Sequence, residues 1–554
     1  MPPAPIQKRL AALALAHPVW LILLAVVAQH APLITARDLW WSDEVRHGGV
    51  LLDLASKGDW WALHLNGAPY TDKPPLYFLF LAGVQRLFGA GPVPIFFGLS
   101  LTVFAYALAC WHLARRLLGE GALALGSVAV LLSGSYILAA SHYARMDFLF
   151  SAAIVLAWSS FYTASVSPAL DRRAILAGFV FVTLATLIKG PVGVLLPLAA
   201  LIGQLAVQGR LRLLADRAVL GGAGILAAGL AIWAGGLIYF GGADYLARLF
   251  DRQIVGRTLD TRGGVWGYLR YFWAFPAVLL PYSLLLLRRW PKTVVQPATR
   301  YLLICIATGL LGLSLIGEKH EYYLIPLLVP ASILLVQVVA GLPARRLGQV
   351  LALWLGLQSG LLLVTPAVIA GLHLPADHLA PALGQAVLPA VLGLALALGL
   401  GLALATRGLL RHWSAVLAAF LAAQTLFGGA LLGRVMPALD PVLSPATLAG
   451  AMRPAIDQGY APAILHGIPG VFAFHLGQHY TALFQLQAVD DWLAVTPRAV
   501  IALQLAEAKA LSARHADFQT LACVPFLGQV YIVLARPSGL DAAPRAQPMA
   551  CPAP

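Results

Sequence analysis

Long apolar stretches recur along most of this 554-residue chain, and they constrain its fold more than any other feature. A run of about 18 or more apolar residues is long enough to cross a bilayer as a helix. Only 11% of the residues are charged, whereas soluble proteins carry about 25%. The pattern therefore predicts a polytopic α-helical membrane protein.

The apolar stretches predict about thirteen membrane-spanning helices. They are expected at residues 19–36, 95–114, 122–140, 148–162, 174–188, 191–207, 219–240, 271–287, 301–316, 323–339, 350–372, 386–405 and 414–432. The first stretch follows Lys8 and Arg9, and no small-residue cleavage site comes after it. We therefore expect it to be a retained span and not a removed signal peptide.

Short basic connections gather on one side of this predicted topology. They contain Lys8/Arg9, Arg115/Arg116, Arg172/Arg173, Arg210/Arg212/Arg217, Arg288/Arg289/Lys292, Arg345/Arg346 and Arg407/Arg411. Basic loops of this kind belong in the cytoplasm, so the alternate connections face outward. This placement explains the net charge of +14 better than nucleic-acid binding does.

The first outward connection, residues 37–90, is long enough to carry structure of its own. Its apolar stretch 76–88 is too short to span a membrane comfortably. The segment 44–57 has apolar residues at helical spacing. We predict that both form helices lying along the outer membrane surface.

The chain changes character after residue 433, where long apolar runs stop. Residues 470–477 and 528–537 alternate in polarity as strands do, and residues 500–516 have a helical pattern. We expect a membrane domain at 1–433, a small α/β domain on the outer side at 434–537, and a disordered tail at 538–554. Cys523 and Cys551 could pair. No dinucleotide or phosphate-loop fingerprint occurs, so no organic cofactor is expected.

Most titratable residues that topology does not require lie in the outward connections. The acidic members are Asp43, Glu44, Asp72, Asp147, Glu318 and Glu321, the basic members are Arg46, Lys73, Arg145, Lys189, Arg252, Arg257, Arg262 and Lys319, and hydroxyls come from Tyr70, Tyr322 and Tyr323. Ions at membrane depth are costly and usually functional. Cations and tyrosines at a membrane boundary suit a lipid-linked phosphate. The set predicts a transferase that moves a sugar from a polyprenyl phosphate carrier.

Each motif also has a structural explanation. Ser42 or Asp43 could cap a helix, Pro74 and Pro75 could turn the chain beside a snorkelling Lys73, Asp147 could pair locally with Arg145, and Tyr323 could belong to an interfacial aromatic belt. Lys189 lies between two apolar runs with no acidic neighbour in sequence. A structural role would need a distant partner, so the sequence favours a functional role.

Five motifs, "DEVRHGG", "LNGAPYTDKPPLYFLFLAG", "IKGPVGVLLP", "RQIVGR" and "KHEYYLIPLLVP", resemble those of the bacterial aminoarabinose lipid A transferases, the ArnT family. That family belongs to the protein-mannosyltransferase-like superfamily with the GT-C fold. The resemblance covers the order of motifs over residues 19–340 and the plan of thirteen spans followed by an outer domain. It implies an inverting glycosyltransferase of the bacterial inner membrane, with its active site and C-terminal domain on the periplasmic side. A monomer is expected, because nothing in the sequence demands a partner subunit.

The resemblance also implies roles for individual residues. Asp43 matches the acidic residue at the heart of the active site, with Arg46, Asp147 and Glu44 as further catalytic candidates. Residues that hold the donor and its phosphate are matched by Tyr70, Lys73, Lys189, Arg257 and Tyr323. Secondary candidates are Asp72, His47, Arg262 and Lys319.

Three positions depart from the family pattern. Asp72 stands where Glu is usual, at a position that can approach a divalent cation, and His47 stands where Tyr is common. "KHEYY" replaces the usual Lys-Leu-Pro-x-Tyr. These departures leave the sugar, the acceptor and any metal open.

The acceptor is expected to be lipid A or a related envelope molecule. A rival enzyme would use the same polyprenyl phosphate donor on a protein or an envelope polysaccharide. A transporter or flippase would instead carry its charges near the bilayer midplane, on broken helices in paired repeats. Here the charges gather on one side and no repeat is visible.

Overall fold

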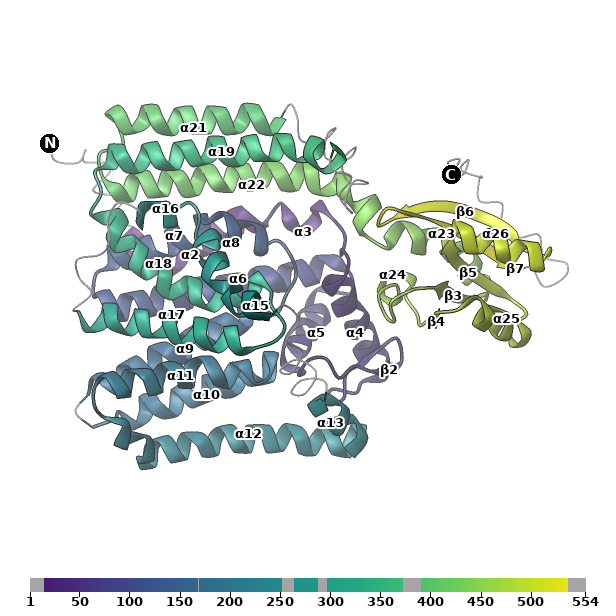
Figure 1. Cartoon of the computed structure of the whole chain (residues 1–554), viewed down its shortest axis with the longest axis horizontal. Coiled ribbons are helices and arrows are strands. Elements are labelled where there is room, and N and C mark those ends of the chain that lie inside the picture. The colour runs from purple at the N-terminus through teal and green to yellow at the C-terminus, as the bar shows by residue number, and fades with distance from the viewer. Residues whose placement is uncertain (1–13, 168, 252–263, 287–295, 372–389, 537–554) are drawn as a thin grey trace.

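The computed structural model describes residues 14–167, 169–251, 264–286, 296–371 and 390–536. Long helices lie side by side in a bundle, with a small α/β unit at one end (Figure 1). Within these ranges, seven helical stretches are long and apolar enough to cross a membrane. They are Pro18–Ala36 (α2 and α3), Pro92–Leu118 (α6), Asp147–Val166 (α9), Arg217–Gly241 (α12), Pro297–Leu315 (α17), Glu321–Ala340 (η3 and α18) and Trp413–Gly433, within α22 (Trp413–Leu443). The multi-pass membrane fold is confirmed, whereas the number of thirteen spans stays a prediction.

Other helices complete the bundle. They are α7 (Gly121–Ser133), α8 (Ser135–Ala140), α10 (Arg172–Lys189), α11 (Val192–Val207), α13 (Ala243–Phe250), α15 (Gly264–Val278), α16 (Ser283–Leu286), α19 (Ala344–Gly371) and α21 (Ala390–Gly408). Two predicted spans are each divided. Gly134 has an extended backbone between α7 and α8, and Pro281, which lacks the amide hydrogen needed to continue a helix, lies between α15 and α16.

Apolar side chains cover the outside of the bundle as well as its inside. On α12 only 6% of the most apolar 18-residue stretch is buried, and Leu220 and Ile232 are 61% and 66% exposed. In η3 and α18 the corresponding buried share is 83%. An apolar outer surface of this kind is stable only against lipid.

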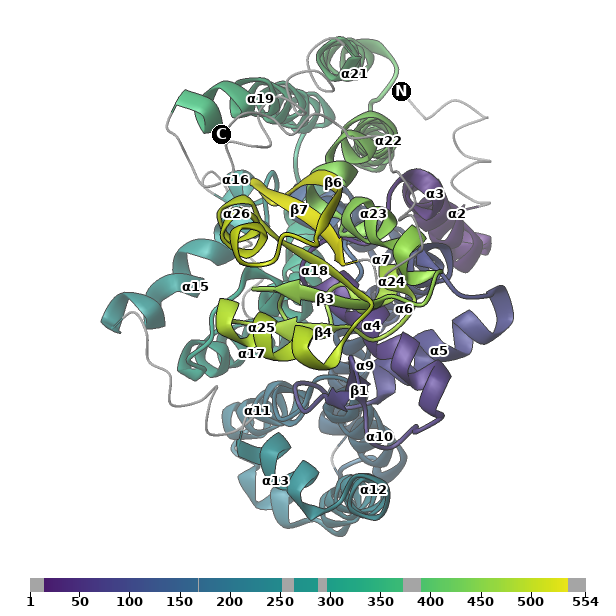
Figure 2. The ribbon, with the colours of Figure 1, turned by 90° about the vertical axis from the view of Figure 1, so that its right-hand side faces the viewer.

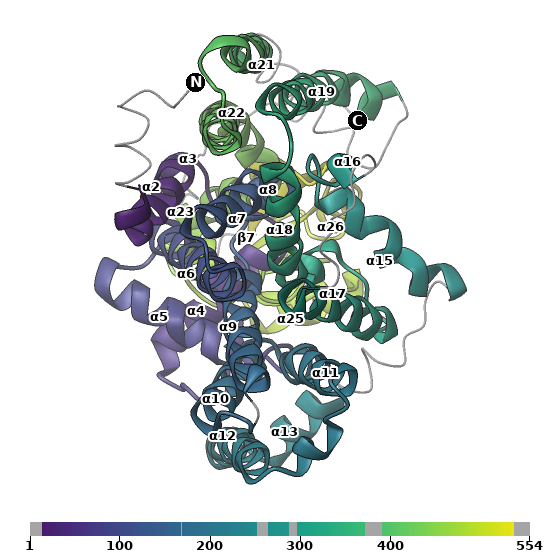
Figure 3. The same ribbon diagram turned by 90° about the vertical axis from the view of Figure 1, so that its left-hand side faces the viewer.

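Helix α9 joins two chemically different ends of the bundle. Asp147 begins it, and near its other end Arg116 donates to the Thr163 hydroxyl at 2.8 Å while Arg210 donates to the Ser165 carbonyl at 2.8 Å. A helix of 20 residues is about 30 Å long, enough to cross the hydrocarbon core of a bilayer. Figure 3 faces the basic end, where the long helices are seen end-on.

The first outer loop forms the two predicted helices, and their placement along the membrane surface stays a prediction. They are α4 (Asp43–Lys57) and α5 (Leu76–Phe88), joined through a small hairpin of β1 (His64–Leu65) and β2 (Ala68–Pro69). In Figure 2 the long helices are viewed end-on and α5 lies across them. Ser42 precedes α4, but its side chain makes no capping hydrogen bond. The helix-cap explanation of the acidic pair is therefore not supported.

The C-terminal unit is a mixed sheet flanked by helices. Helix α22 continues to Leu443, past the expected boundary at residue 433, and α23 (Ala446–Ile456) follows. The strand order is β4-β3-β5-β7-β6, in which β3 pairs parallel with β4 and β5, and β7 pairs antiparallel with β5 and β6. The strands are β3 (Ala461–Leu465), β4 (Thr481–Leu483), β5 (Ala499–Gln504), β6 (Gln519–Phe526) and β7 (Gln529–Arg536), and the helices are α24 (Ala473–Leu476), α25 (Leu486–Val495) and α26 (Leu505–Arg514).

Two local predictions for this unit were wrong. Residues 500–504 belong to β5, not to a helix that runs to residue 516, because the sheet buries their apolar side chains on both faces. Residues 470–477 contain the short helix α24 instead of a strand. Cys523 lies in β6 and is disulfide-bonded, while Cys551 lies outside the described residues.

The C-terminal unit packs directly on α4. A Cβ atom at Gly48 would lie 2.7 Å from the Phe474 ring, and one at Gly49 would lie 2.8 Å from the Gly470 carbonyl oxygen. Only glycine permits such an approach. The contact explains the glycine pair in the motif "DEVRHGG".

Candidate active site

Charged residues of alternating sign form a chain at the outer end of the bundle. The Asp43 carboxylate on α4 pairs with Arg46 through one oxygen and with Arg145 through the other, at 2.9 Å. Arg145 also reaches Asp147 at 3.2 Å, and Asp147 pairs with Lys189 at the end of α10. These five residues come from segments far apart in the sequence, and the structure brings them together as one ionic cluster.

Depth differs along this cluster. The side chains of Asp147 and Lys189 are 2% and 9% exposed, while those of Arg46 and Asp43 are 27% and 24% exposed. The buried pair therefore anchors the cluster within the helix ends, and Asp43 with Arg46 faces outward. Asp147 is the distant partner that a structural role of Lys189 would require, so the pair is also consistent with that alternative. The local pairing of Arg145 with Asp147 is also present, but it is one link of the larger cluster.

Two tyrosines of η3 (Glu321–Leu324), the short helix that leads into α18 (Ile325–Ala340), cover the cations. The Arg145 guanidinium lies 3.4 Å from the centre of the Tyr322 ring, and the Lys189 ammonium lies 4.5 Å from that of Tyr323. Such cation–π contacts stabilise a charge without neutralising it. The Tyr323 hydroxyl donates to Glu318 at 3.1 Å, so its orientation is fixed as well.

The motif "YTDK" contributes a second polar group. The Tyr70 hydroxyl and the Lys73 ammonium each lie 3.4 Å from the same Asp72 oxygen. Lys73 is near enough to Asp43 to lower the pKa of that carboxyl. The Lys73 group therefore belongs to the same site as the ionic cluster.

Asp43 is held in its ionised form. Burial alone would raise its pKa, but Arg145, His47, Arg46 and Lys73 outweigh that effect and lower the pKa to about 2. A carboxylate with so low a pKa is ionised at neutral pH and is a weak base. Its geometry suits orientation of a substrate better than proton abstraction.

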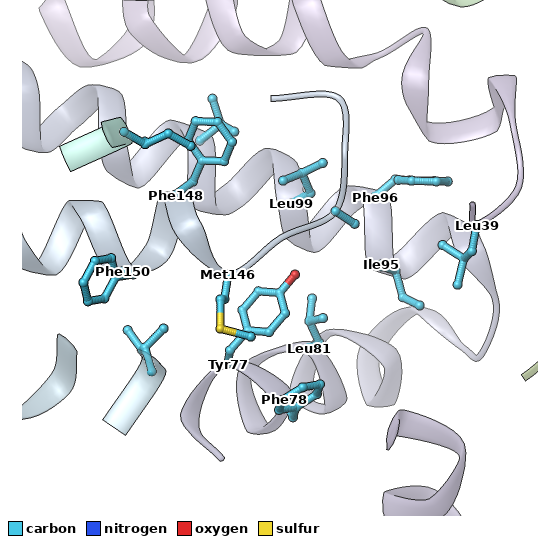
Figure 4. Close-up of a cluster of buried hydrophobic side chains, with 14 of the residues drawn as sticks. Leu39, Tyr77, Phe78, Leu81, Ile95, Phe96, Leu99, Met146, Phe148 and Phe150 are labelled. Carbon is cyan, nitrogen blue, oxygen red and sulfur yellow. The ribbon is translucent and has the colours of Figure 1, made fainter. Parts of the chain in front are cut away.

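A layer of apolar side chains supports the site from below (Figure 4). Met146 and Phe148, on either side of Asp147, are 3% and 0% exposed within it. Tyr77 and Phe78 of α5 are also fully buried in this layer. The sequence thus alternates residues that enter the core with residues that build the site, which fixes the direction of Arg145 and Asp147.

The structure separates Glu44 from the site, although it is next to Asp43 in sequence. The Glu44 carboxylate is fully buried and accepts hydrogen bonds from Arg37 at 2.6 and 2.7 Å and from the Trp40 amide at 2.9 Å. Sequence reasoning missed Arg37, which is itself buried. The partners of Glu44 therefore lie outside the ionic cluster, and they fit a structural role.

The secondary candidates fall into different places. Lys319 donates to the Leu313, Ser314 and Ile316 carbonyls at the end of α17, where a cation offsets the helix dipole. His47 is buried behind Asp43. Arg257 and Arg262 lie outside the described residues. The sequence analysis assigned no site role to Arg145. Its contact with Asp43 makes it part of the ionic cluster.

No metal centre is formed by the described part of the chain, because it has no group of three or more His, Cys, Asp or Glu side chains placed to hold an ion. Lys73 and Tyr70 both contact the Asp72 carboxylate. An ammonium group and a phenol are poor partners for a divalent cation. A metal beside Asp72 stays a prediction.

Gly193 of the motif "IKGPVG" allows α11 to pack tightly on α10 near Lys189. A Cβ atom there would lie 2.5 Å from the Thr186 amide nitrogen, a backbone atom that cannot turn aside. We expect Gly193→Ala to destabilise the fold by about 1–3 kcal/mol, measured as a lower Tm in detergent. Gly224→Ala on α12 is the control, because no atom lies within 4 Å of the added Cβ. An unchanged Tm for Gly193→Ala would contradict the tight contact.

Comparison with known proteins agrees with this architecture. The family model described as dolichyl-phosphate-mannose-protein mannosyltransferase matches residues 72–233. The undecaprenyl phosphate-alpha-4-amino-4-deoxy-L-arabinose arabinosyl transferase of Serratia proteamaculans is 27% identical over 340 residues, which cover 57% of this chain and 58% of that protein. The match thus spans less than two thirds of that relative. The enzyme of the same name from Edwardsiella ictaluri is 27% identical, over 74% of this chain and 75% of its own.

Solved structures extend the likeness over nearly the whole chain. The structure of ArnT from Cupriavidus metallidurans bound to undecaprenyl phosphate superposes with a TM-score of 0.76 at 19% identity, covering 94% of this chain and 99% of that one. The apo form gives a TM-score of 0.73 at 18% identity. Together with the motifs and the helical bundle, these matches show that the chain is similar to the aminoarabinose transferases and has the fold of ArnT.

Proposed function

We propose that this protein is a membrane glycosyltransferase that moves a sugar from a polyprenyl phosphate carrier to a lipid acceptor. The carrying observation is the site itself, where Asp43 lies between two guanidinium groups, with Lys73 nearby, at the end of a membrane bundle. The named activity of the relatives and the undecaprenyl phosphate bound in the solved ArnT structure support this choice of donor. The sugar we propose is 4-amino-4-deoxy-L-arabinose.

In the proposed reaction, the bond between the anomeric carbon and the carrier phosphate oxygen breaks, and its electron pair leaves on the phosphate. The acceptor oxygen forms the new bond from the opposite face, which inverts the anomeric centre. Lys73, Tyr70 and Tyr323 would stabilise the negative charge on the leaving phosphate. Lys189, held by Asp147, would supply a further fixed positive charge beneath Tyr323.

The low pKa of Asp43 favours one class of acceptor. A hydroxyl acceptor needs a base to take its proton, and a carboxylate held by two arginines is a poor base. An acceptor phosphate, such as that of lipid A, is already ionised and needs only orientation. We therefore favour a lipid phosphate over a protein or polysaccharide hydroxyl. One chain holds all the described site residues, so the proposal requires no second subunit.

The site is proposed to face the periplasm across a bacterial inner membrane. The basic residues around Arg116 and Arg210 lie at the opposite end of α9, and short basic loops remain in the cytoplasm. Transport is disfavoured because the ionic cluster lies at the helix ends and not at mid-depth.

The direct test uses purified protein in detergent with radiolabelled polyprenyl-phosphate sugars and a panel of acceptors. We expect transfer of the aminoarabinose to lipid A, and transfer to a protein or polysaccharide would favour the rival enzyme. Absence of transfer from every polyprenyl-phosphate donor would contradict the proposed function.

We expect Lys73→Ala to raise KM for the donor about tenfold, because the leaving phosphate loses a charge-assisted contact. Steady-state kinetics at several donor concentrations measure this change. Lys57→Ala is the matched control, since Lys57 is an exposed lysine at the end of α4 that donates to the Gly67 carbonyl. Equal KM values for the two variants would remove Lys73 from the donor site.

A further inference from the structure

Two side chains of α4 form hydrogen bonds with the backbone of Ala144, one with its amide and one with its carbonyl. Its amide donates to the Glu44 carboxylate at 2.5 Å, and its carbonyl lies 3.2 Å from Nδ1 of His47. Glu44 and His47 are three residues apart and so share a face of the helix. A carbonyl oxygen can only accept, so Nδ1 carries the proton and donates.

These two hydrogen bonds are rigid because the side chains of Glu44 and His47 are themselves held by other contacts. Both Glu44 oxygens are fixed by Arg37, and the side chains of the pair are 0% and 1% exposed. His47 is 4% exposed and packs edge-on against Tyr77, with ring centres 5.4 Å apart. Neither Glu44 nor His47 can turn away from Ala144 without leaving a buried polar group unsatisfied.

The residue that follows Ala144 is Arg145, which reaches back to Asp43 on the same helix. Helix α4 therefore contacts this segment at two points, the backbone of Ala144 and the guanidinium of Arg145. On the other side, Met146 is anchored in the apolar layer. The backbone on both sides of Arg145 is thus fixed before any substrate binds.

We propose that Glu44 and His47 are positioning residues that set the Arg145 guanidinium between Asp43 and Asp147. The effect on catalysis rests on the proposed function, while the two hydrogen bonds to Ala144 do not. Neither residue contacts the reacting groups. Both act through Arg145, which they place without touching it.

A neutral donor suits this position. Burial lowers the pKa of His47 to about 4, with Asp43 opposing and Arg145 and Arg46 assisting that shift. At neutral pH the imidazole is therefore uncharged and adds no positive charge beside two guanidinium groups. A lysine at this position would donate equally well but would repel the group that it positions.

Three substitutions separate the hydrogen bond from simple packing. The amide of His47→Asn can replace the Nδ1 donor, whereas His47→Leu removes it and the longer His47→Gln places its amide beyond it. We expect kcat to fall about tenfold in His47→Leu and His47→Gln and less than about threefold in His47→Asn. KM for the donor should stay unchanged, because Lys73 and Tyr323 are not displaced. A similar fall in all three variants would overturn the proposal.

A double-mutant cycle tests whether His47 acts through Arg145. In an Arg145→Lys background, His47→Leu should lower kcat by less than about twofold, because residues that act together are not additive. Equal effects of His47→Leu in the two backgrounds would show that His47 acts independently of Arg145, and would overturn the proposed role.

Hydrogen exchange provides a measurement that does not depend on activity. The amides of residues 141–148 should exchange at least about threefold faster in His47→Leu and His47→Gln, and at the native rate in His47→Asn. Leu54→Ala, a buried apolar change further along α4, is the control that lowers stability without releasing this segment. Unchanged exchange in His47→Leu and His47→Gln would show that His47 does not hold this backbone segment, even in an active enzyme. A protein that transfers no sugar but shows this pattern would refute only the proposed function.

Discussion

Replacement of Asp43 by asparagine is expected to lower kcat about a hundredfold. The variant keeps the size of the side chain but removes the charge that Arg46 and Arg145 share. Both guanidinium groups would then turn toward other anions, including the substrate phosphates, and the acceptor would lose its fixed orientation. Transfer of labelled sugar under saturating donor measures the effect.

Asp244→Asn provides the matched control, because Asp244 is an exposed aspartate of α13 outside the ionic cluster. Its kcat should equal that of the wild type. If Asp43→Asn retained more than about half of the wild-type kcat, Asp43 would not belong to the active site.

Loss of Lys189 is expected to have the largest effect on stability. Of the two ionic partners that Asp147 has within the described ranges, Lys189→Met leaves only Arg145 beside this buried carboxylate. Breaking a buried ion pair from one side costs about 3–5 kcal/mol. The apparent Tm in detergent should therefore fall by several degrees, and kcat should fall as well.

The double variant Asp147→Leu/Lys189→Met separates stability from activity. Replacing a buried pair by apolar residues of similar size is often neutral, so its Tm should return close to the wild-type value. Its kcat should stay low, because the positive charge beneath Tyr323 is gone. A double variant as unstable as Lys189→Met would show that the pair is not the source of the loss. Lys57→Met, an exposed change on α4, should leave both quantities unchanged.

The membrane fold and the two helices of the first outer loop could be predicted because their signals are local. Apolar length alone distinguishes the spanning α9 from the shorter α5, and Pro74 and Pro75 mark where α5 begins. The strand β5 was missed because a short apolar run fits a buried strand and a helix equally well. Its parallel neighbour β3, which decides the matter, lies at residues 461–465.

The sequence could predict most of the residues that form the site, but not which of them contact one another. Asp43 and Glu44 are adjacent, yet neighbours on a helix point about 100° apart, so only one of them can face the substrate. Which one does so depends on Arg37 and Ala144, and the second of these is 100 residues away along the chain. The bridge from Asp43 to Arg145 is equally non-local. Contacts of this kind leave no periodic pattern in one sequence.

The close contact of Gly48 and Gly49 with the C-terminal unit limits how this protein can be rebuilt. Helix α4 carries Asp43 on its first turn and meets Phe474 and Gly470 one turn later. A hybrid that takes its last hundred or so residues from a relative would therefore press on the helix that bears the active-site carboxylate. Functional hybrids should require the first outer loop and the C-terminal unit to be exchanged together, as one inherited block.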